Sequence, residues 1–151
     1  MLAFYLSIAF IIATIMTIQS PNSKLKKDLS KHLSEKELQY YQDIIIMRRN
    51  IYFQGLVLGI ILAIIIICFV PQMKKAKKSN RLYSAIAITF VVNYFYYILY
   101  PKDKYMIELL DTKEENKAWL EIYKTMQFRY HLGFLFGLVA AGCVHALYIY
   151  R

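Results

Sequence analysis

Four long apolar stretches without a single Asp, Glu, Lys or Arg restrict this chain more than any other feature. Each is close to the length of about 20 residues that a helix needs to cross the hydrocarbon layer of a membrane. The stretches run from Leu2 to Ile18, from Ile51 to Val70, from Leu82 to Tyr100 and from Tyr130 to Tyr150. The composition agrees, because 58% of the 151 residues are hydrophobic and only 19% are charged. The sequence therefore predicts an all-α membrane protein with four transmembrane helices.

A proline stands just past each of the first three stretches, at Pro21, Pro71 and Pro101. Proline has no amide N–H and clashes with the preceding helical turn, so it is tolerated where a helix has already ended. The apolar pattern and the prolines are independent signals, and they predict the same helix ends.

The first stretch has an alternative interpretation as a cleaved signal peptide. It lacks a basic segment in front of the apolar run, and the residues from Thr17 to Pro21 offer no small-x-small cleavage pattern. We therefore expect this stretch to remain as the first transmembrane helix.

An internal repeat becomes visible when the sequence is shifted by 78 residues. Both copies hold a capping box, in which a hydroxyl and a glutamate three residues later exchange hydrogen bonds at a helix start. The aligned pairs are Ser34 with Thr112, Glu37 with Glu115, Tyr41 with Trp119, Tyr52 with Tyr130, Gly55 with Gly133 and Gly59 with Gly137. The sequence predicts two tandem-duplicated helical hairpins within a single domain over residues 1–151. Repeat one covers residues 1–71, repeat two covers 82–151, and a basic linker at 72–81 joins them.

The two capping boxes predict that the second and fourth long helices begin outside the membrane. The second would run from Glu35 to Val70 and the fourth from Lys113 to Tyr150. At a rise of 1.5 Å per residue the second helix is about 54 Å long, so about 20 Å of it projects beyond the hydrocarbon layer. We expect a pair of long helices that project on the same side of the membrane.

All five glycines lie in the second and fourth stretches, which calls for a packing reason because glycine is a poor helix former. Gly55 with Gly59, and Gly133 with Gly137, form small-xxx-small motifs that let another backbone come close. We expect these two faces to pack against each other along a seam that continues outward through aromatic residues. The seam residues are Tyr41, Tyr52, Trp119 and Tyr130. In the alternative arrangement, the glycine faces pack against the first and third helices or against a second copy of the chain.

The linker between the repeats is strongly basic, in a chain whose net charge is +9. Lys74, Lys75, Lys77 and Lys78 predict a contact with anionic lipid, worth about 1 kcal/mol for each lysine near such a surface. Alternatively, the lysines act only as a topology signal. Nucleic acid is not favoured as a partner, because the linker has no aromatic residue for bases to stack on. The two large loops, residues 22–50 and 102–129, carry more Lys and Arg in total than the side with the basic linker. The sequence therefore does not decide which side of the membrane these loops occupy.

The sequence holds no Ser–His–Asp, HExxH or phosphate-loop pattern, and we expect no enzymatic activity. Cys143 and His145 supply two ligands where a structural zinc needs four, so we expect no metal and no other cofactor. The polar residues inside the apolar stretches include Gln54 and Asn93, but no carboxylate.

These patterns predict a non-enzymatic multi-pass membrane protein with a structural or scaffolding role. Its projecting helices would be presented to a partner layer or complex, and its partners would be the lipid bilayer, other membrane or peripheral proteins, and a second copy of the chain. Residues with AT-rich codons are abundant, which suits an organelle complex subunit or a membrane component of a large virus. The alternative is a small oligomeric transporter or channel whose path is lined by Gln54, Asn93 and His145.

Overall fold

The computed structural model describes residues 1–18 and 22–149, and most of these residues are helical. The α-helices are α1 (Leu2–Ile18), α2 (Asn22–His32), α3 (Glu35–Phe69), α4 (Pro71–Lys75), α5 (Lys78–Leu99) and α6 (Lys113–Ile149), with a 3-10 helix, η1 (Met106–Glu108), between α5 and α6. These bounds confirm the predicted all-α class. They also confirm the ends of the first three long helices to within a few residues, whereas Tyr150 lies outside the described residues. In length and composition, α3 and α5 are suited to cross a membrane, and α1 is an apolar helix of 17 residues.

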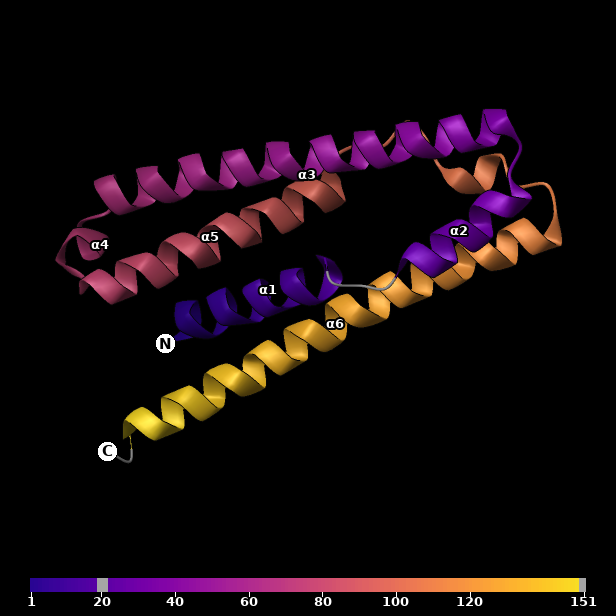
Figure 1. Ribbon diagram of the computed structural model, residues 1–151. Coiled ribbons are helices and arrows are strands. Elements are labelled where there is room, and N and C mark those ends of the chain that lie inside the picture. Colours follow the sequence, from indigo (N-terminus) through magenta and orange to yellow (C-terminus); the bar gives the residue numbers. More distant parts are fainter. Residues whose placement is uncertain (19–21, 150–151) are drawn as a thin grey trace.

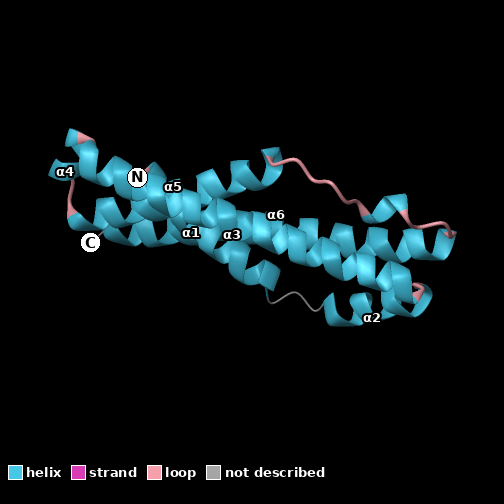
Figure 2. Ribbon diagram, turned by 90° about the horizontal axis from the view of Figure 1, so that it is seen from above, coloured by secondary structure: helices cyan, strands magenta, loops and turns pink. Residues whose placement is uncertain are grey.

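The molecule is elongated, and its long helices run side by side along its length (Figure 1). The start of α1, the short helix α4 and the end of α6 lie at one end, while α2 and η1 lie at the other, as a view from above also shows (Figure 2). We call residues 22–50 and 101–129 the head. The remaining helical segments form the apolar half, in which α1 packs against α6, α3 packs against α5, and α1 also contacts α5.

Local hydrogen bonds explain where the long helices begin and end. At α3 the Ser34 amide donates to the Glu37 carboxylate at 2.6 Å, and at α6 the Thr112 amide donates to Glu115 at 3.0 Å. Both boxes are closed by the return bond to the hydroxyl, so the two predicted capping boxes are confirmed. Hydrogen bonds from Ser34 lower the pKa of the Glu37 carboxyl, which keeps the first box ionised and intact.

The C-terminus of α5 is closed differently, by a lysine that follows Pro101. Lys102 donates from Nζ to the carbonyl oxygens of Tyr97, Ile98 and Tyr100, at 2.6, 3.1 and 3.0 Å. These carbonyls have no partner within the helix, and a positive charge suits this end of the helix dipole.

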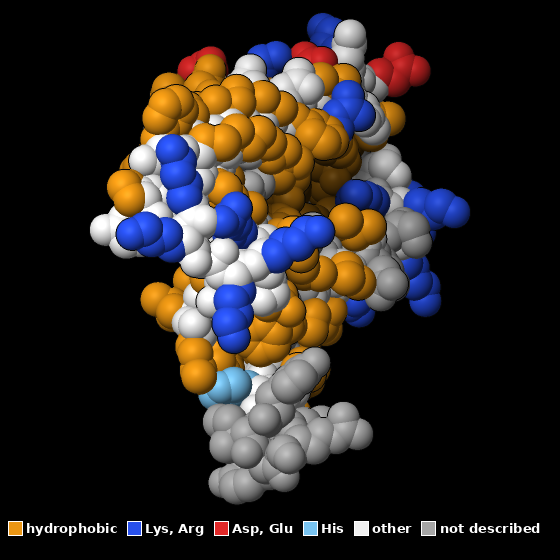
Figure 3. Space-filling model, turned by 90° about the vertical axis from the view of Figure 1, so that its left-hand side faces the viewer, with side chains coloured by type: hydrophobic (Ala, Val, Ile, Leu, Met, Phe, Trp, Pro, Cys, Tyr) orange, Lys and Arg blue, Asp and Glu red, His pale blue; other side chains and the backbone are white. Residues whose placement is uncertain are grey.

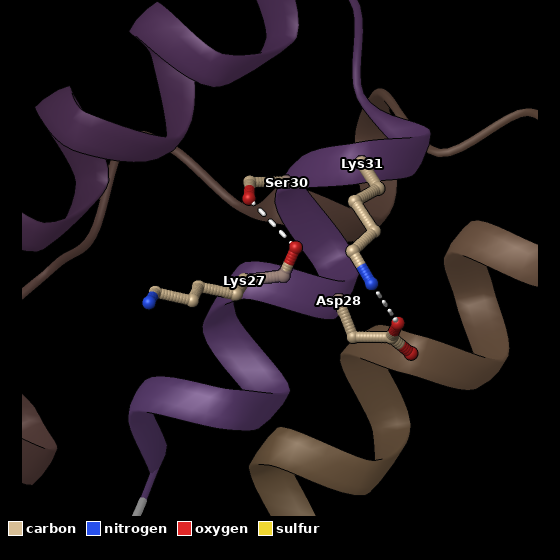
Figure 4. Close-up of polar contacts among 4 residues, drawn as sticks. All are labelled: Lys27, Asp28, Ser30 and Lys31. Atoms are coloured by element: carbon tan, nitrogen blue, oxygen red, sulfur yellow. Dashed lines mark hydrogen bonds and ion pairs between the residues drawn. The ribbon is translucent and has the colours of Figure 1, made fainter.

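Two segments between the predicted helices are also helical. The first contains α2, which packs along α6 and is closed by local bonds: Ser30 donates to the Lys27 carbonyl at 2.8 Å, and Lys31 pairs with Asp28 at 3.4 Å (Figure 4). In the second, the basic linker folds into α4 and the first turn of α5, which begins at Lys78 rather than at Leu82.

The head has a hydrophobic core of its own, to which α2, α3, η1 and α6 contribute. Its buried side chains are Leu29, Tyr41, Ile44, Met106, Leu110 and Ile122. Trp119 is partly buried against this core, and its ring meets that of Tyr41 edge to face with centroids 6.1 Å apart. The core therefore joins the two long helices at the head.

Because Trp119 is the single tryptophan, its fluorescence reports on this core directly. We expect iodide to quench the wild-type fluorescence weakly and to quench the Tyr41→Ala variant more strongly. Tyr41→Ala also removes an aromatic pair worth about 0.5–1.5 kcal/mol beyond its buried area. Tyr123→Ala is the matched control, because Tyr123 is 52% exposed and should leave the quenching unchanged. Equal quenching in all three proteins would show that the two rings do not shield each other.

Candidate functional site

The glycines of α3 are the points where α5 comes closest. A Cβ atom added at Gly59 would lie 2.5 Å from the carbonyl oxygen of Thr89, and one added at Gly55 would lie 2.6 Å from Asn93 Oδ1. Both distances are shorter than contacts between such atoms in folded proteins, so only glycine permits this packing.

The glycines of α6 serve α1 in the same way. A Cβ atom at Gly137 would lie 2.4 Å from Ala9 Cα, and one at Gly133 would lie 2.9 Å from Ala13 Cα. The prediction that the two glycine faces pack against each other is therefore wrong, and the alternative with the first and third helices is correct. The reason is that a small-xxx-small motif offers a smooth surface to whichever helix fits it, without specifying which one.

The two glycine crossings use corresponding residues of the two halves of the chain. Gly59 meets Thr89, and Gly137 meets Ala9. The two glycines are 78 residues apart in the sequence, and their two partners are 80 residues apart. The second pair of glycines follows the same two spacings, because Gly55 meets Asn93 and Tyr96 while Gly133 meets Ala13 and Met16. Each crossing joins a helix of the first half to a helix of the second.

The predicted aromatic seam is present in the head but opens in the apolar half. Tyr41 and Trp119 touch, as described above. Further along the same two helices, Tyr52 and Tyr130 both line one cavity, and no contact between their rings is formed. Among the described residues, α3 and α6 are not packed along each other, because α1 and α5 occupy the space between them.

This cavity has a volume of about 570 Å³ and is walled by α1, α3, α5 and α6. Its floor includes Phe10 and Phe90, whose rings stack with centroids 5.8 Å apart and planes 9° apart. Towards the head its wall holds Arg48 and Arg49 of α3. The size falls within the range of about 300–1,000 Å³ that is usual for ligand sites.

Asn93 lines the same cavity and is 3% exposed, yet its Oδ1 atom has no hydrogen-bond partner among the described residues. Arg48 donates to the carbonyl oxygen of Lys104 at 3.3 Å and lies over the ring of Tyr105. Neither Arg48 nor Arg49 forms an ion pair with an acidic residue in the described part of the chain. Arg48 is half-buried and Arg49 is exposed, and their unused donors give the site the capacity to bind an anion.

The other polar residues predicted inside the apolar stretches lie in separate surroundings. Gln54 accepts a hydrogen bond from the Tyr96 hydroxyl at 3.3 Å, on the far side of the α3–α5 contact from the cavity. His145 lies 3.0 Å from the Tyr5 hydroxyl through Nδ1, where α6 crosses the start of α1. The structure does not bring these two residues and Asn93 together along one path. In the described part, no three His, Cys, Asp or Glu side chains form a cluster suited to a metal.

The basic linker presents all four of its predicted lysines to the surroundings. Lys74, Lys75, Lys77 and Lys78 are exposed, and basic side chains gather on the end of the molecule where α4 lies (Figure 3). Arg81 holds the turn in shape through hydrogen bonds to the carbonyl oxygens of Lys74 and Ala76. The linker is thus an ordered basic corner and not an open loop.

Sequence reasoning missed the cavity, although parts of its wall were visible. The Arg48–Arg49 pair directly precedes an apolar stretch, a position that is typical of a membrane boundary.

Comparison of the chain with protein-family models, with curated proteins and with solved structures finds no match.

The glycine crossings predict which glycines tolerate a side chain. We expect Gly59→Ala and Gly137→Ala to destabilise the protein by about 1–3 kcal/mol, the usual scale of overpacking, and the Leu variants to do so by at least as much. Gly142→Ala should be neutral or stabilising, because its Cβ atom would meet only Tyr5, at 4.0 Å, and alanine favours a helix. Thermal unfolding in mild detergent measures the difference. A Gly59→Ala protein as stable as Gly142→Ala would refute the close crossing with α5.

Proposed function

We propose that this chain is a four-span integral membrane protein, built from two duplicated hairpins, that serves as a non-enzymatic scaffold. Its spans are α1, the apolar parts of α3 and α6, and α5. Its head is presented to a partner layer or complex outside the membrane, and its lysine corner contacts anionic lipid on the opposite side.

The observation that carries the proposal is the distribution of large and small residues in the apolar half. In the apolar half of α3 the buried positions are Gly55, Gly59 and Ala63, with Ile51 next to the head, and in α6 they include Gly133 and Gly137. Apart from Ile51, the large apolar side chains described in these two segments are half-buried or exposed. Among them Val57, Ile64, Leu135, Phe136 and Val139 are each more than half exposed.

This arrangement suits lipid and does not suit water. Proteins in water bury their large apolar side chains and rarely leave a broad apolar surface open. Helices in a bilayer gain nothing from burying such side chains against each other, so small residues take the interfaces and large ones face the acyl chains. The head follows the opposite rule, because Ile44, Met106 and Ile122 are buried there.

The duplication is supported by the paired contacts of the two glycine crossings and by the two capping boxes. Further support comes from the Phe10–Phe90 stack and the Tyr41–Trp119 pair, since in each pair the two rings occupy corresponding positions of the two halves. A pseudo-two-fold axis along the membrane normal relates two parallel repeats in this way.

A scaffolding role is supported by the head, whose core ties the long helices together while apolar side chains remain on its surface. Leu120, Tyr123 and Phe128 of α6 are 46%, 52% and 65% exposed. Exposed apolar groups beyond the proposed membrane boundary are typical of a surface that meets another protein. Stoichiometric copurification of a protein from native membranes would support this role, and a chain that purifies alone under mild detergent would count against it.

Topology provides the direct test of the four spans. In a variant without Cys68 and Cys143, single cysteines at Ser23, Ser79 and Lys113 are labelled with a membrane-impermeant maleimide. We expect the cysteine at 79 to be labelled from one side and those at 23 and 113 from the other, because an even number of spans separates the latter two. Labelling of 79 and 113 from the same side would refute the four-span topology.

A further inference from the structure

The cavity between α1, α3, α5 and α6 lies where the apolar half meets the head, and its two ends differ in chemistry. Phe10 and Phe90 stand at the inner end, and Ile18 and Ile98 stand about 12 Å nearer the head at the helical rise of 1.5 Å per residue. Arg48 and Arg49 lie at the same end as Ile18 and Ile98, because α3 runs in the opposite direction. The cavity thus changes from aromatic and apolar to cationic along its length.

Neither arginine at the cationic end forms an ion pair in the described part of the chain. Arg48 has five N–H donors and uses one of them, on the carbonyl of Lys104. The pKa of the neighbouring Lys102 is lowered by its burial and then by the positive charge of Arg48. The carboxylate of Asp43 is already paired with Lys104, at 3.0 Å, so the two arginines keep donors for an anion.

The remainder of the cavity favours an apolar chain attached to that anion. Its aromatic floor offers no charge to a soluble ion such as free phosphate, whereas a hydrocarbon tail would fill it and gain dispersion contacts. Thr14 adds no polar demand, because its hydroxyl already donates to the Phe10 carbonyl of its own helix at 2.8 Å. The Asn93 Oδ1 atom lies against Gly55 of α3 and is buried there, whereas the cavity wall also holds the tyrosines Tyr94, Tyr97 and Tyr130, whose amphipathic rings suit the region between a headgroup and a hydrocarbon chain.

We propose that this cavity is a binding site for a single amphiphile with an anionic headgroup, held by Arg48 and Arg49, and an apolar chain that lies against Phe10 and Phe90. Basic pockets between transmembrane helices recognise lipid headgroups in this manner. The headgroup is a phosphate or a carboxylate, and a membrane phospholipid and a free fatty acid are its two sources. The proposal goes beyond the scaffolding role and is tested independently of it.

Native mass spectrometry of the full chain in an uncharged detergent tests the site with four probes. Palmitoyl-oleoyl phosphatidylglycerol and oleate carry both parts of the ligand, dioleoylglycerol carries only the chains, and inorganic phosphate carries only the anion. We expect one equivalent of phosphatidylglycerol or oleate to bind at least about tenfold more tightly than either partial probe. The stronger of the two identifies the source of the ligand. Dioleoylglycerol binding as tightly would exclude a role for the arginines, and phosphate binding as tightly would exclude a role for the chain.

Variants locate the binding. Arg49→Gln, which disturbs no hydrogen bond given above, and the double variant Arg48→Gln/Arg49→Gln should each weaken binding, the double at least about tenfold. Thr14→Trp should also weaken it by filling the cavity. Arg129→Gln is the matched control, because Arg129 is half-buried on α6 and does not line the cavity, so it should change the affinity less than twofold.

Two results would overturn the proposal. One is equal loss of affinity in Arg129→Gln and Arg49→Gln, which would mean that headgroups bind anywhere on the basic surface. The other is binding of many lipids without saturation in every variant. Melting temperatures without added lipid are measured in parallel, so that a loss of binding through unfolding is distinguished from loss of the site. Failure of the proposal leaves the labelling pattern at positions 23, 79 and 113 untouched.

Discussion

The approach of one backbone to another at four glycines is the contact on which the remaining architecture depends. In the proposed membrane setting no hydrophobic force draws helices together, so association rests on van der Waals fit between closely matched surfaces. Gly55 and Gly59 hold α5 against α3, and Gly133 and Gly137 hold α1 against α6. Once each short helix occupies the smooth face of a long one, the long helices are kept apart in the apolar half. They meet again only in the head, at Tyr41 and Trp119.

Features governed by neighbouring residues could be predicted from the sequence, whereas pairing between distant helices could not. The capping boxes at Ser34 and Thr112 depend only on residues within three positions of each other, so the sequence predicted the starts of α3 and α6 correctly. The glycine motifs predicted a close helix crossing but did not indicate which helix would be the partner. The helix α2 was missed because Leu25 and Leu29 are its only regular apolar positions among lysines, and short helices depend on tertiary packing for their stability.

The cavity illustrates the same limit at the level of function. Its walls come from four helices, and only the order of those helices in space makes Arg49 a neighbour of Ile18. The sequence shows Asn93 only as a polar residue in an apolar stretch. In the structure its Oδ1 atom lies against Gly55 of α3, which has no side chain that could donate a hydrogen bond to it. Only the packing of α5 on α3 leaves this oxygen buried without a partner among the described residues.

The pairing of α1 with α6 has a consequence for how the chain is made. Among the described helices α1 is synthesised before all others and α6 after all others, and the two share the most extensive helix contact in the described molecule. While the ribosome works through the intervening residues, the small-residue face of α1, with Ser7, Ala9 and Ala13, has no α6 to cover it. In the proposed membrane setting, α1 is held in lipid or by an insertion factor during this interval. The packing between these two helices therefore forms only after α6 has been synthesised.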